Sequence, residues 1–291
     1  MQKTNFRWVI LAIIFITYTI NFADRSNIGV ALPFIRQEFH ITNFEAGAIA
    51  SFFFLGYAIS QIPAGLIMSK FGFRGIVSLS IIGFSVFTFL IGTAKSASFL
   101  NWCRLGLGLT EGPTPVGLTS TINNWFPAKE KATAVGVYIA STMFAPIIIP
   151  PICVWIATTY SWHYIFYIFA IPGFFMAAIW YLVVRTHPRE CRFVNQAELD
   201  YITSGAAVAD EKKEEKFVSL GILDKLIRIK NVRKLASNRE VFKSWNIWGN
   251  CFSYFMMVSV LYGLLTWVPF CLGDAEGDCF RRVGLGAMCR W

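Results

Sequence analysis

The sequence predicts an all-α membrane protein with seven transmembrane helices. Of its 291 residues, 55% are hydrophobic and 15% are charged, and the mean hydropathy is +0.53. That composition is more apolar than a soluble domain requires. Apolar runs long enough to cross a bilayer, which takes about 20 helical residues, recur along the chain. We place seven of them, at Trp8–Val30, Phe44–Met68, Gly75–Thr93, Leu100–Ile122, Ala134–Thr158, Trp162–Val184 and Trp245–Phe270.

The spacing of these runs divides the chain into four parts. Six runs follow one another closely and predict a six-helix transmembrane bundle over residues 1–185. The chain then turns polar over residues 186–244, which we interpret as a central loop. The seventh helix is expected over residues 245–270. Residues 271–291 contain no further apolar run of spanning length, and we interpret them as an aberrant C-terminal tail.

The net charge of +9 is explained by the expected membrane topology, because the basic residues gather on one side of the membrane, and it does not indicate nucleic-acid binding. With the N-terminus in the cytoplasm, the short cytoplasmic segments hold six basic residues, whereas the opposite side of the bundle holds two. The positive-inside rule therefore places the N-terminus and the central loop in the cytoplasm. The six are Lys3, Arg7, Lys70, Arg74, Lys129 and Lys131, and the two are Arg36 and Lys95.

Two segments of the central loop have a distinctive composition. Residues 210–216 form a run of mixed acidic and basic side chains, which is typical of a solvated linker. Further along, Leu220, Leu223 and Leu226 recur at helical spacing among lysines and arginines. This pattern predicts a basic amphipathic helix that lies on the cytoplasmic surface of the membrane.

Metal, cofactor and enzyme chemistry find no support in the sequence. The three histidines are far apart, and the seven cysteines form no CxxC pair, so we propose no metal site and no cofactor. The cysteines within apolar runs have the character of small reduced hydrophobic residues. No pairing of a nucleophile with a base can be argued from these positions, and we therefore do not expect an enzyme.

Four ionisable residues inside the apolar runs are the main functional signal. Asp24 and Arg25 lie in the first run, and Arg104 and Glu111 lie in the fourth. Each costs about 2.5 to 3.5 kcal/mol at the centre of a membrane helix. Such residues usually face a polar cavity, pair with one another or bind an ion or substrate. The alternative is that the four form two buried ion pairs that only hold helices together.

Arg104 and Glu111 share one face of the fourth helix, with Gly108 between them. Their separation along the helix axis is about 10.5 Å, too long for direct contact, so each should meet a partner from another helix. Gly106 and Gly108 would let a neighbouring helix approach closely. Because the charged helices are the first and the fourth, they match the arrangement of two three-helix inverted repeats around a site at the membrane midplane.

The first helix carries a polar and aromatic stripe that contains Tyr18, Asn21, Phe22 and Arg25. Guanidinium groups bind carboxylates through planar, paired hydrogen bonds and stay charged when desolvated. Two arginines facing one cavity would therefore suit an organic anion. A carboxylate in that cavity can gain or lose a proton as substrate and water exchange, which proton coupling requires. For Tyr57, ordinary helix packing remains the alternative.

Five sequence motifs resemble the major facilitator superfamily, and within it the anion:cation symporter branch of organic-acid transporters. The run Asn21–Pro33 carries the clearest similarity. A loop motif, a fourth-helix motif and two later landmarks follow in the same order as in that family, at Gly65–Arg74, Arg104–Pro113, Trp125–Ala132 and Ser161–Phe166.

This resemblance implies a sugar-acid transporter that is driven by protons and works by alternating access. The substrate would be an aldonate, a hexuronate or a glucarate. The resemblance assigns proton coupling to Asp24 and Glu111. The substrate-binding set is Asn21, Arg25, Tyr57, Arg104 and Thr142, and the gating loop is represented by Gly65, Ser69, Lys70, Gly72 and Arg74.

Three residues depart from the family pattern. Ser69 stands where the loop motif normally has an aspartate, Phe22 replaces a common tyrosine, and Thr142 lies where galactonate-type members have a glutamine. These departures leave the particular substrate open.

The resemblance also implies a multi-pass protein of the cell membrane, with the bilayer, a small organic carboxylate and protons as its partners and with no nucleic acid. Relatives have twelve spans, so we interpret the chain as truncated after the seventh helix, with the C-terminal half or a second chain as a required partner. Two alternatives remain: an inactive truncated transporter, or a receptor that binds the anion and signals through the central loop.

Overall fold

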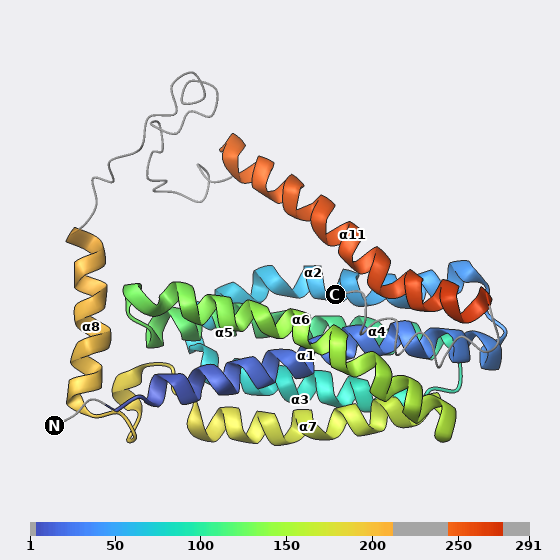
Figure 1. The fold of residues 1–291 in the computed structure, drawn as a ribbon, viewed down its shortest axis with the longest axis horizontal. Coiled ribbons are helices and arrows are strands. Elements are labelled where there is room, and N and C mark those ends of the chain that lie inside the picture. Colours follow the sequence, from blue (N-terminus) through green and yellow to red (C-terminus); the bar gives the residue numbers. More distant parts are fainter. Residues whose placement is uncertain (1–3, 212–243, 276–291) are drawn as a thin grey trace.

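Long α-helices form nearly all of the described chain in this computed structural model, which describes residues 4–211 and 244–275 (Figure 1). The helices are α1 (Phe6–Phe39), α2 (Asn43–Phe71), α3 (Phe73–Gly92), α4 (Ala97–Glu111), α5 (Pro113–Trp125), α6 (Ala128–Thr159), α7 (Trp162–Val183), α8 (Gln196–Glu211) and α11 (Trp245–Ala275), with a 3-10 turn η1 at Pro188–Glu190.

The helices α1 to α7 run along one axis as a bundle, and the closest helix pairs are α2 with α4, α3 with α7, and α1 with α6. Figure 1 shows α8 standing across the end of the bundle that holds the N-terminus, and α11 crossing the bundle obliquely. The N-terminal part of α11 diverges from the bundle, while its later part approaches α1 and α2. We call the end that carries the N-terminus the near end and the opposite one the far end.

Local sequence signals fix where α2 and α4 begin and where α2 ends. Thr42 and Glu45 form a reciprocal capping box, in which the Glu45 amide donates to Thr42 Oγ1 (3.3 Å) and the Thr42 amide donates to Glu45 Oε2 (2.8 Å). Ser96 caps α4 by accepting from the Phe99 amide (3.3 Å). Gly72 separates α2 from α3 with φ of 76°, a backbone conformation that glycine adopts without steric cost.

The fourth predicted span is broken, which its hydropathy does not predict. The expected helix Leu100–Ile122 is divided into α4 and α5 at Gly112 and Pro113. Proline has no amide hydrogen, and its ring clashes with the carbonyl one turn earlier, so Pro113 begins a new helix. Gly112 keeps helical dihedrals and donates to the Gly108 carbonyl (3.0 Å), so α5 follows α4 without an intervening loop.

The length and composition of the helices are those of a multi-pass membrane protein. Among the described residues, six helices are long and apolar enough to cross a bilayer, and the shorter α4 and α5 are not among them. Large apolar side chains cover the outside of the bundle, including Ile62 (77% exposed) and Leu79 (70% exposed). Contact with lipid explains this surface, because exposing so large an apolar area to water is unfavourable. Prolines inside α1, α2, α6 and α7 also fit helices that neighbouring helices support within a membrane.

Glycines bring α2 and α4 into backbone contact, as the small residues of the fourth helix predicted. A Cβ atom on Gly108 would lie 2.1 Å from the Phe53 carbonyl oxygen. A Cβ atom on Gly56 would lie 2.3 Å from the Leu105 carbonyl oxygen. Because the obstacle in both cases is backbone, any larger side chain would force the two helices apart.

A buried charged cluster joins α8 to the near end of the bundle. The Glu198 side chain is fully buried and accepts hydrogen bonds from Thr4 Oγ1 (2.6 Å) and Arg7 Nη1 (2.9 Å). It also accepts from the backbone amides of Phe6 and Arg7, the first residues of α1. Arg7 pairs in addition with Glu130 at the start of α6 (2.7 Å). In the sequence, Arg7 is recognisable only as a basic residue of the expected cytoplasmic side, and this cluster was not predicted.

Removing the Glu198 carboxylate should release α8 from the bundle. Loss of one partner from a buried ion pair costs about 3 kcal/mol, and 1.4 kcal/mol corresponds to a factor of ten. We therefore expect Glu198→Ala to raise hydrogen-exchange rates of the first α8 amides about a hundredfold in the purified chain. The control is Asp200→Asn, since Asp200 is exposed on the same helix and bonds only Gln196 within the described contacts. Equal exchange in the two variants would contradict a docking role for Glu198.

Some predictions concern residues that the structure does not describe. The basic amphipathic helix around Leu220, Leu223 and Leu226 lies outside the described residues, as does most of the linker 210–216. The predicted tail is described only to Ala275, where α11 ends. Within the predicted central loop, the described part contains η1 and α8.

Candidate functional site

The four intramembrane charges all lie in the interior of the bundle. Asp24 and Arg104 are 2% exposed, Arg25 is 8% exposed, and Glu111 is fully buried. Asp24 and Arg25 occupy the middle of α1, and Arg104 and Glu111 lie seven residues apart on α4. The backbone contact between α2 and α4 holds α4 against the aromatic side chains of α2.

Arg25 and Glu111 form an ion pair between α1 and α4. Arg25 Nε donates to Glu111 Oε1 at 2.6 Å, and Arg25 Nη2 lies 2.5 Å from the same oxygen. This confirms that Glu111 meets a partner from another helix, which lies on the first helix. Glu111 Oε2 has no hydrogen-bond partner among the described residues, although it is buried. The pair therefore leaves one carboxylate oxygen available to a proton, a water molecule or a ligand.

Asp24 has polar but uncharged partners. Its Oδ2 accepts from Thr88 Oγ1 on α3 (3.0 Å), and its Oδ1 accepts from Asn27 Nδ2 (3.3 Å). Within residues 4–211 and 244–275, no ion pair joins Asp24 to Arg104. The alternative interpretation expected the four charges to form two structural ion pairs. Among the described residues they form one, between Arg25 and Glu111. Thr88 was not predicted as a partner of Asp24, although a threonine in an apolar run was the available signal.

Arg104 is the buried cation of the described chain that lacks a carboxylate at ion-pair distance. Its Nε donates weakly to the Ile49 carbonyl (3.4 Å), and its Nη1 donates to the Asp24 carbonyl (3.5 Å). The guanidinium also lies 4.7 Å from the ring centroid of Phe53. These long contacts leave most of the N–H donors of the guanidinium unused, so Arg104 can donate hydrogen bonds to a carboxylate ligand.

Aromatic rings surround the Arg25 guanidinium. The Arg25 Cζ atom lies 4.5 Å from the ring centroid of Tyr57 and 4.7 Å from that of Phe22. Phe53 and Tyr262 lie at 5.5 Å and 6.0 Å. Tyr57 therefore contacts the buried guanidinium, and its predicted role in substrate binding stays a prediction. We did not predict Phe53 and Tyr262, although Phe53 is one turn from Tyr57 and Tyr262 is a polar aromatic residue within the seventh run.

The other two predicted substrate residues, Asn21 and Thr142, differ in whether they contact the four charges. Asn21 Oδ1 accepts from Arg25 Nη2 (3.4 Å), whereas the Nδ2 atom of Asn21 is buried without a hydrogen-bond partner in the described chain. Thr142 lies on α6, where its hydroxyl donates to the Ile139 carbonyl (2.7 Å). It lies one turn from Tyr138, whose ring stacks on Tyr18 (4.5 Å). Among the described contacts, none joins Thr142 to the four charges.

The predicted gating loop lies at the near end of the bundle, away from the charged site. Tyr57 and Ser69 are twelve residues apart on α2, which corresponds to about 18 Å along the helix. Ser69 donates to the Leu66 carbonyl (2.8 Å), and Lys70 is exposed. Arg74 donates to the Tyr181 carbonyl at the end of α7 (2.8 Å) and stacks on its ring. The loop residues are therefore placed to act on the helix ends and not on a bound substrate.

The chain is similar to named transporters of sugar acids. It is 29% identical to the probable galactarate/D-glucarate transporter GudP of Bacillus subtilis, an alignment that covers 98% of this chain. It is 31% identical to the D-galactonate transporter of Escherichia coli O6:H1 over 96% of this chain. In both cases the alignment covers 62% of the relative, so the chain spans about three fifths of the length of these proteins.

Solved structures share the fold. A bacterial homologue of the human lysosomal transporter Spinster matches 99% of this chain and 59% of its own, with a TM-score of 0.71 and 20% identity. The proton:xylose symporter XylE matches 72% of this chain and 53% of its own, with a TM-score of 0.58 and 14% identity. At these identities the likeness concerns the fold alone.

The sequence profile of the Major Facilitator Superfamily matches residues 14–278. This range contains all four intramembrane charges and the aromatic rings around Arg25. The relatives are named as transporters and not as enzymes. From the match over most of its length, the helical bundle and the similarity to these transporters, the chain belongs to the Major Facilitator Superfamily.

Proposed function

We propose that this chain binds the carboxylate of a sugar acid at the Arg25–Glu111 and Arg104 site, and that it serves proton-coupled symport of that anion by alternating access. The observation that carries the proposal is the group of two arginines and two carboxylates buried within the bundle, of which Arg104 has no carboxylate partner in the described chain. Galactarate, D-glucarate and D-galactonate, named for the relatives, are the substrates to test first.

Charge balance supplies a mechanism for the coupling. With all four groups ionised, two positive and two negative charges cancel within the site. When Glu111 or Asp24 takes up a proton, one arginine charge is left uncompensated. A substrate carboxylate then restores neutrality, and a buried charge is costly unless it is compensated. Proton and anion are thus expected to enter the site together.

The proposal places the protein in the cell membrane with its N-terminus in the cytoplasm. The basic residues of the near end support this orientation, since cytoplasmic loops carry the excess of lysine and arginine. In that orientation α8 and the gating loop are cytoplasmic, and the loop between α1 and α2 faces the other side. The anion, protons and the bilayer are then the partners of the chain.

Carboxylate binding to the purified chain in lipid nanodiscs tests the function directly. Isothermal titration with D-galactonate, galactarate and D-glucarate should show saturable binding, whereas neutral D-galactose should not bind. The neutral sugar is the matched control because it keeps the hydroxyl groups and lacks the charge that the arginines compensate. Failure of every sugar acid to bind, or equal binding of D-galactose, would contradict the proposal.

Arg104→Ala should weaken that binding strongly. A hydrogen bond to a charged group contributes about 1.5 to 3 kcal/mol, so we expect the dissociation constant to rise about 10- to 100-fold. Lys95→Ala removes the same charge from an exposed position between α3 and α4 and should leave the constant unchanged. Equal dissociation constants for Arg104→Ala and Lys95→Ala would remove Arg104 from the substrate site.

A further inference from the structure

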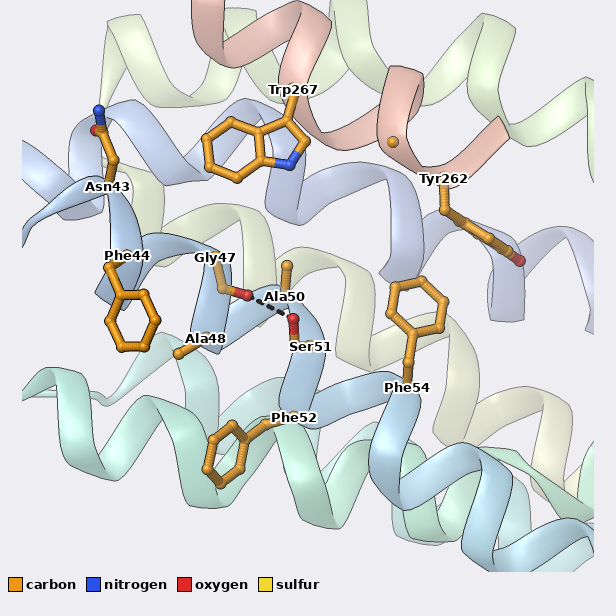
Figure 2. A pocket seen from close by; sticks show the side chains of 11 residues that line it. Asn43, Phe44, Gly47, Ala48, Ala50, Ser51, Phe52, Phe54, Tyr262 and Trp267 are labelled. Carbon is orange, nitrogen blue, oxygen red and sulfur yellow. Dashed lines mark hydrogen bonds between the residues drawn. The ribbon is translucent and has the colours of Figure 1, made fainter. Parts of the chain in front are cut away.

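A cavity of about 600 Å³ lies between α2 and α11, toward the far end of the bundle (Figure 2). One wall is formed by the first turns of α2, from Asn43 to Phe54, and the other by Tyr262, Gly263 and Trp267 of α11. The lining is mostly apolar and aromatic. This volume is in the range of pockets that hold small organic ligands.

Tyr262 lies where this cavity meets the charged site. Its ring packs on Phe54 with the ring centroids 4.7 Å apart. Figure 2 shows the Tyr262 ring beside Phe54 with its hydroxyl directed away from the rest of the cavity. That hydroxyl accepts a hydrogen bond from Arg25 Nη1 at 2.6 Å. One side chain therefore both lines the cavity and touches the buried guanidinium.

The hydrogen bonds of Arg25 leave one edge for a second carboxylate, and Tyr262 occupies it. Glu111 Oε1 takes Nε and Nη2. Of the two terminal nitrogens, Nη1 donates to Tyr262, and Nη2 also makes a long hydrogen bond to Asn21 Oδ1 (3.4 Å). A carboxylate pairs with a guanidinium through two parallel N–H groups, so a substrate can bind the terminal edge of Arg25 only when the Tyr262 hydroxyl has left it.

We infer that Tyr262 is a gate between the α2–α11 cavity and Arg25, and that a substrate carboxylate opens it by taking the place of the phenol hydroxyl. The inference rests on the proposed function for the identity of the ligand. A carboxylate binds a guanidinium through two parallel hydrogen bonds and through the attraction of opposite charges, whereas the Tyr262 hydroxyl accepts one hydrogen bond from Arg25 and carries no charge. A carboxylate therefore displaces the hydroxyl, whereas a neutral sugar does not, and the gate selects for anions.

Chemical modification of Arg25 tests the gate without any substrate. Phenylglyoxal reacts with the two terminal nitrogens of a guanidinium, and peptide mass spectrometry reports the modification at each arginine. In the purified chain, Tyr262→Phe keeps the ring against Phe54 and removes the hydroxyl, so Arg25 should react roughly tenfold faster. Tyr254→Phe, a change of the same kind at an exposed position of α11, should not alter the rate. Equal Arg25 rates in the wild-type chain and in Tyr262→Phe would overturn the inference.

Binding of D-galactonate, galactarate and D-glucarate separates the gate from the proposed substrate class. The gate predicts that Tyr262→Phe binds the preferred sugar acid about tenfold more tightly, because no hydroxyl must be displaced, and that the bound acid protects Arg25 from phenylglyoxal. Weaker binding by Tyr262→Phe would overturn the gate and make Tyr262 a substrate ligand. Faster Arg25 modification with no binding of any of the three acids would support the gate and contradict the proposed substrate.

Discussion

Glu111→Gln is expected to abolish the uptake of protons that accompanies carboxylate binding. The glutamine resembles the protonated carboxylic acid and cannot take up a further proton, while its carbonyl oxygen can still accept from Arg25. Glu111 Oε2 is buried and has no partner in the described chain, so it is the natural place for the coupled proton. If proton binding and anion binding are coupled, thermodynamic linkage requires that the site hold more protons when the anion is bound than when it is absent.

Titration calorimetry in buffers of different ionisation enthalpy measures how many protons the purified chain takes up for each carboxylate that it binds. We expect about one proton per bound carboxylate for the wild-type chain and none for Glu111→Gln. Glu190→Gln removes an exposed carboxylate at the near end and should keep the wild-type stoichiometry. If Glu111→Gln still takes up one proton per carboxylate, the coupling must be assigned to Asp24, and Asp24→Asn should then abolish it.

Gly56→Val should strongly destabilise the bundle. The new Cβ atom would lie 2.3 Å from the Leu105 carbonyl oxygen and 2.9 Å from the Leu109 amide nitrogen. Neither atom can move without shifting α4, so the cost should lie at the upper end of overpacking effects, about 3 kcal/mol. Since Phe53 and Tyr57 flank Gly56 on α2, the same shift would also displace two rings that contact Arg25.

Unfolding of the purified chain by sodium dodecyl sulfate, followed by circular dichroism, measures this loss. Gly136→Val on α6 is the matched control, because it makes the same change at a helical position whose Cβ would meet nothing within 4 Å. We expect the free energy of unfolding to fall far more for Gly56→Val than for Gly136→Val. Similar losses would mean that the contact between α2 and α4 can widen at little cost.

The sequence was sufficient for the helical fold and for the residues that carry buried charge. Apolar runs and the basic residues between them follow directly from the requirements of a bilayer, and both can be counted along the chain. The high cost of charge in a membrane marked Asp24, Arg25, Arg104 and Glu111 before any partner was known. The glycine spacing of α4 likewise predicted a close neighbour, which the structure identifies as α2.

The break at Gly112 and Pro113 shows how local chemistry can be overlooked within a strong hydropathy signal. Hydropathy averaged over a long run is insensitive to a single proline, although proline alone is enough to end one helix and begin the next. The Glu198 cluster was missed for a related reason. Arg7 and Glu198 are far apart in sequence, and nothing in either local pattern indicates that their side chains meet.

Which side chains meet was decided only by the tertiary structure. The sequence by itself determined the composition of the membrane spans and the identities of the buried charges, because these depend on transfer from water to lipid, residue by residue. The pairing of Arg25 with Glu111, the uncharged partners of Asp24 and the contact of Tyr262 with Arg25 depend on how helices far apart in sequence pack against one another. Packing of that kind is a property of the whole bundle, since each crossing is set by side chains on both helices.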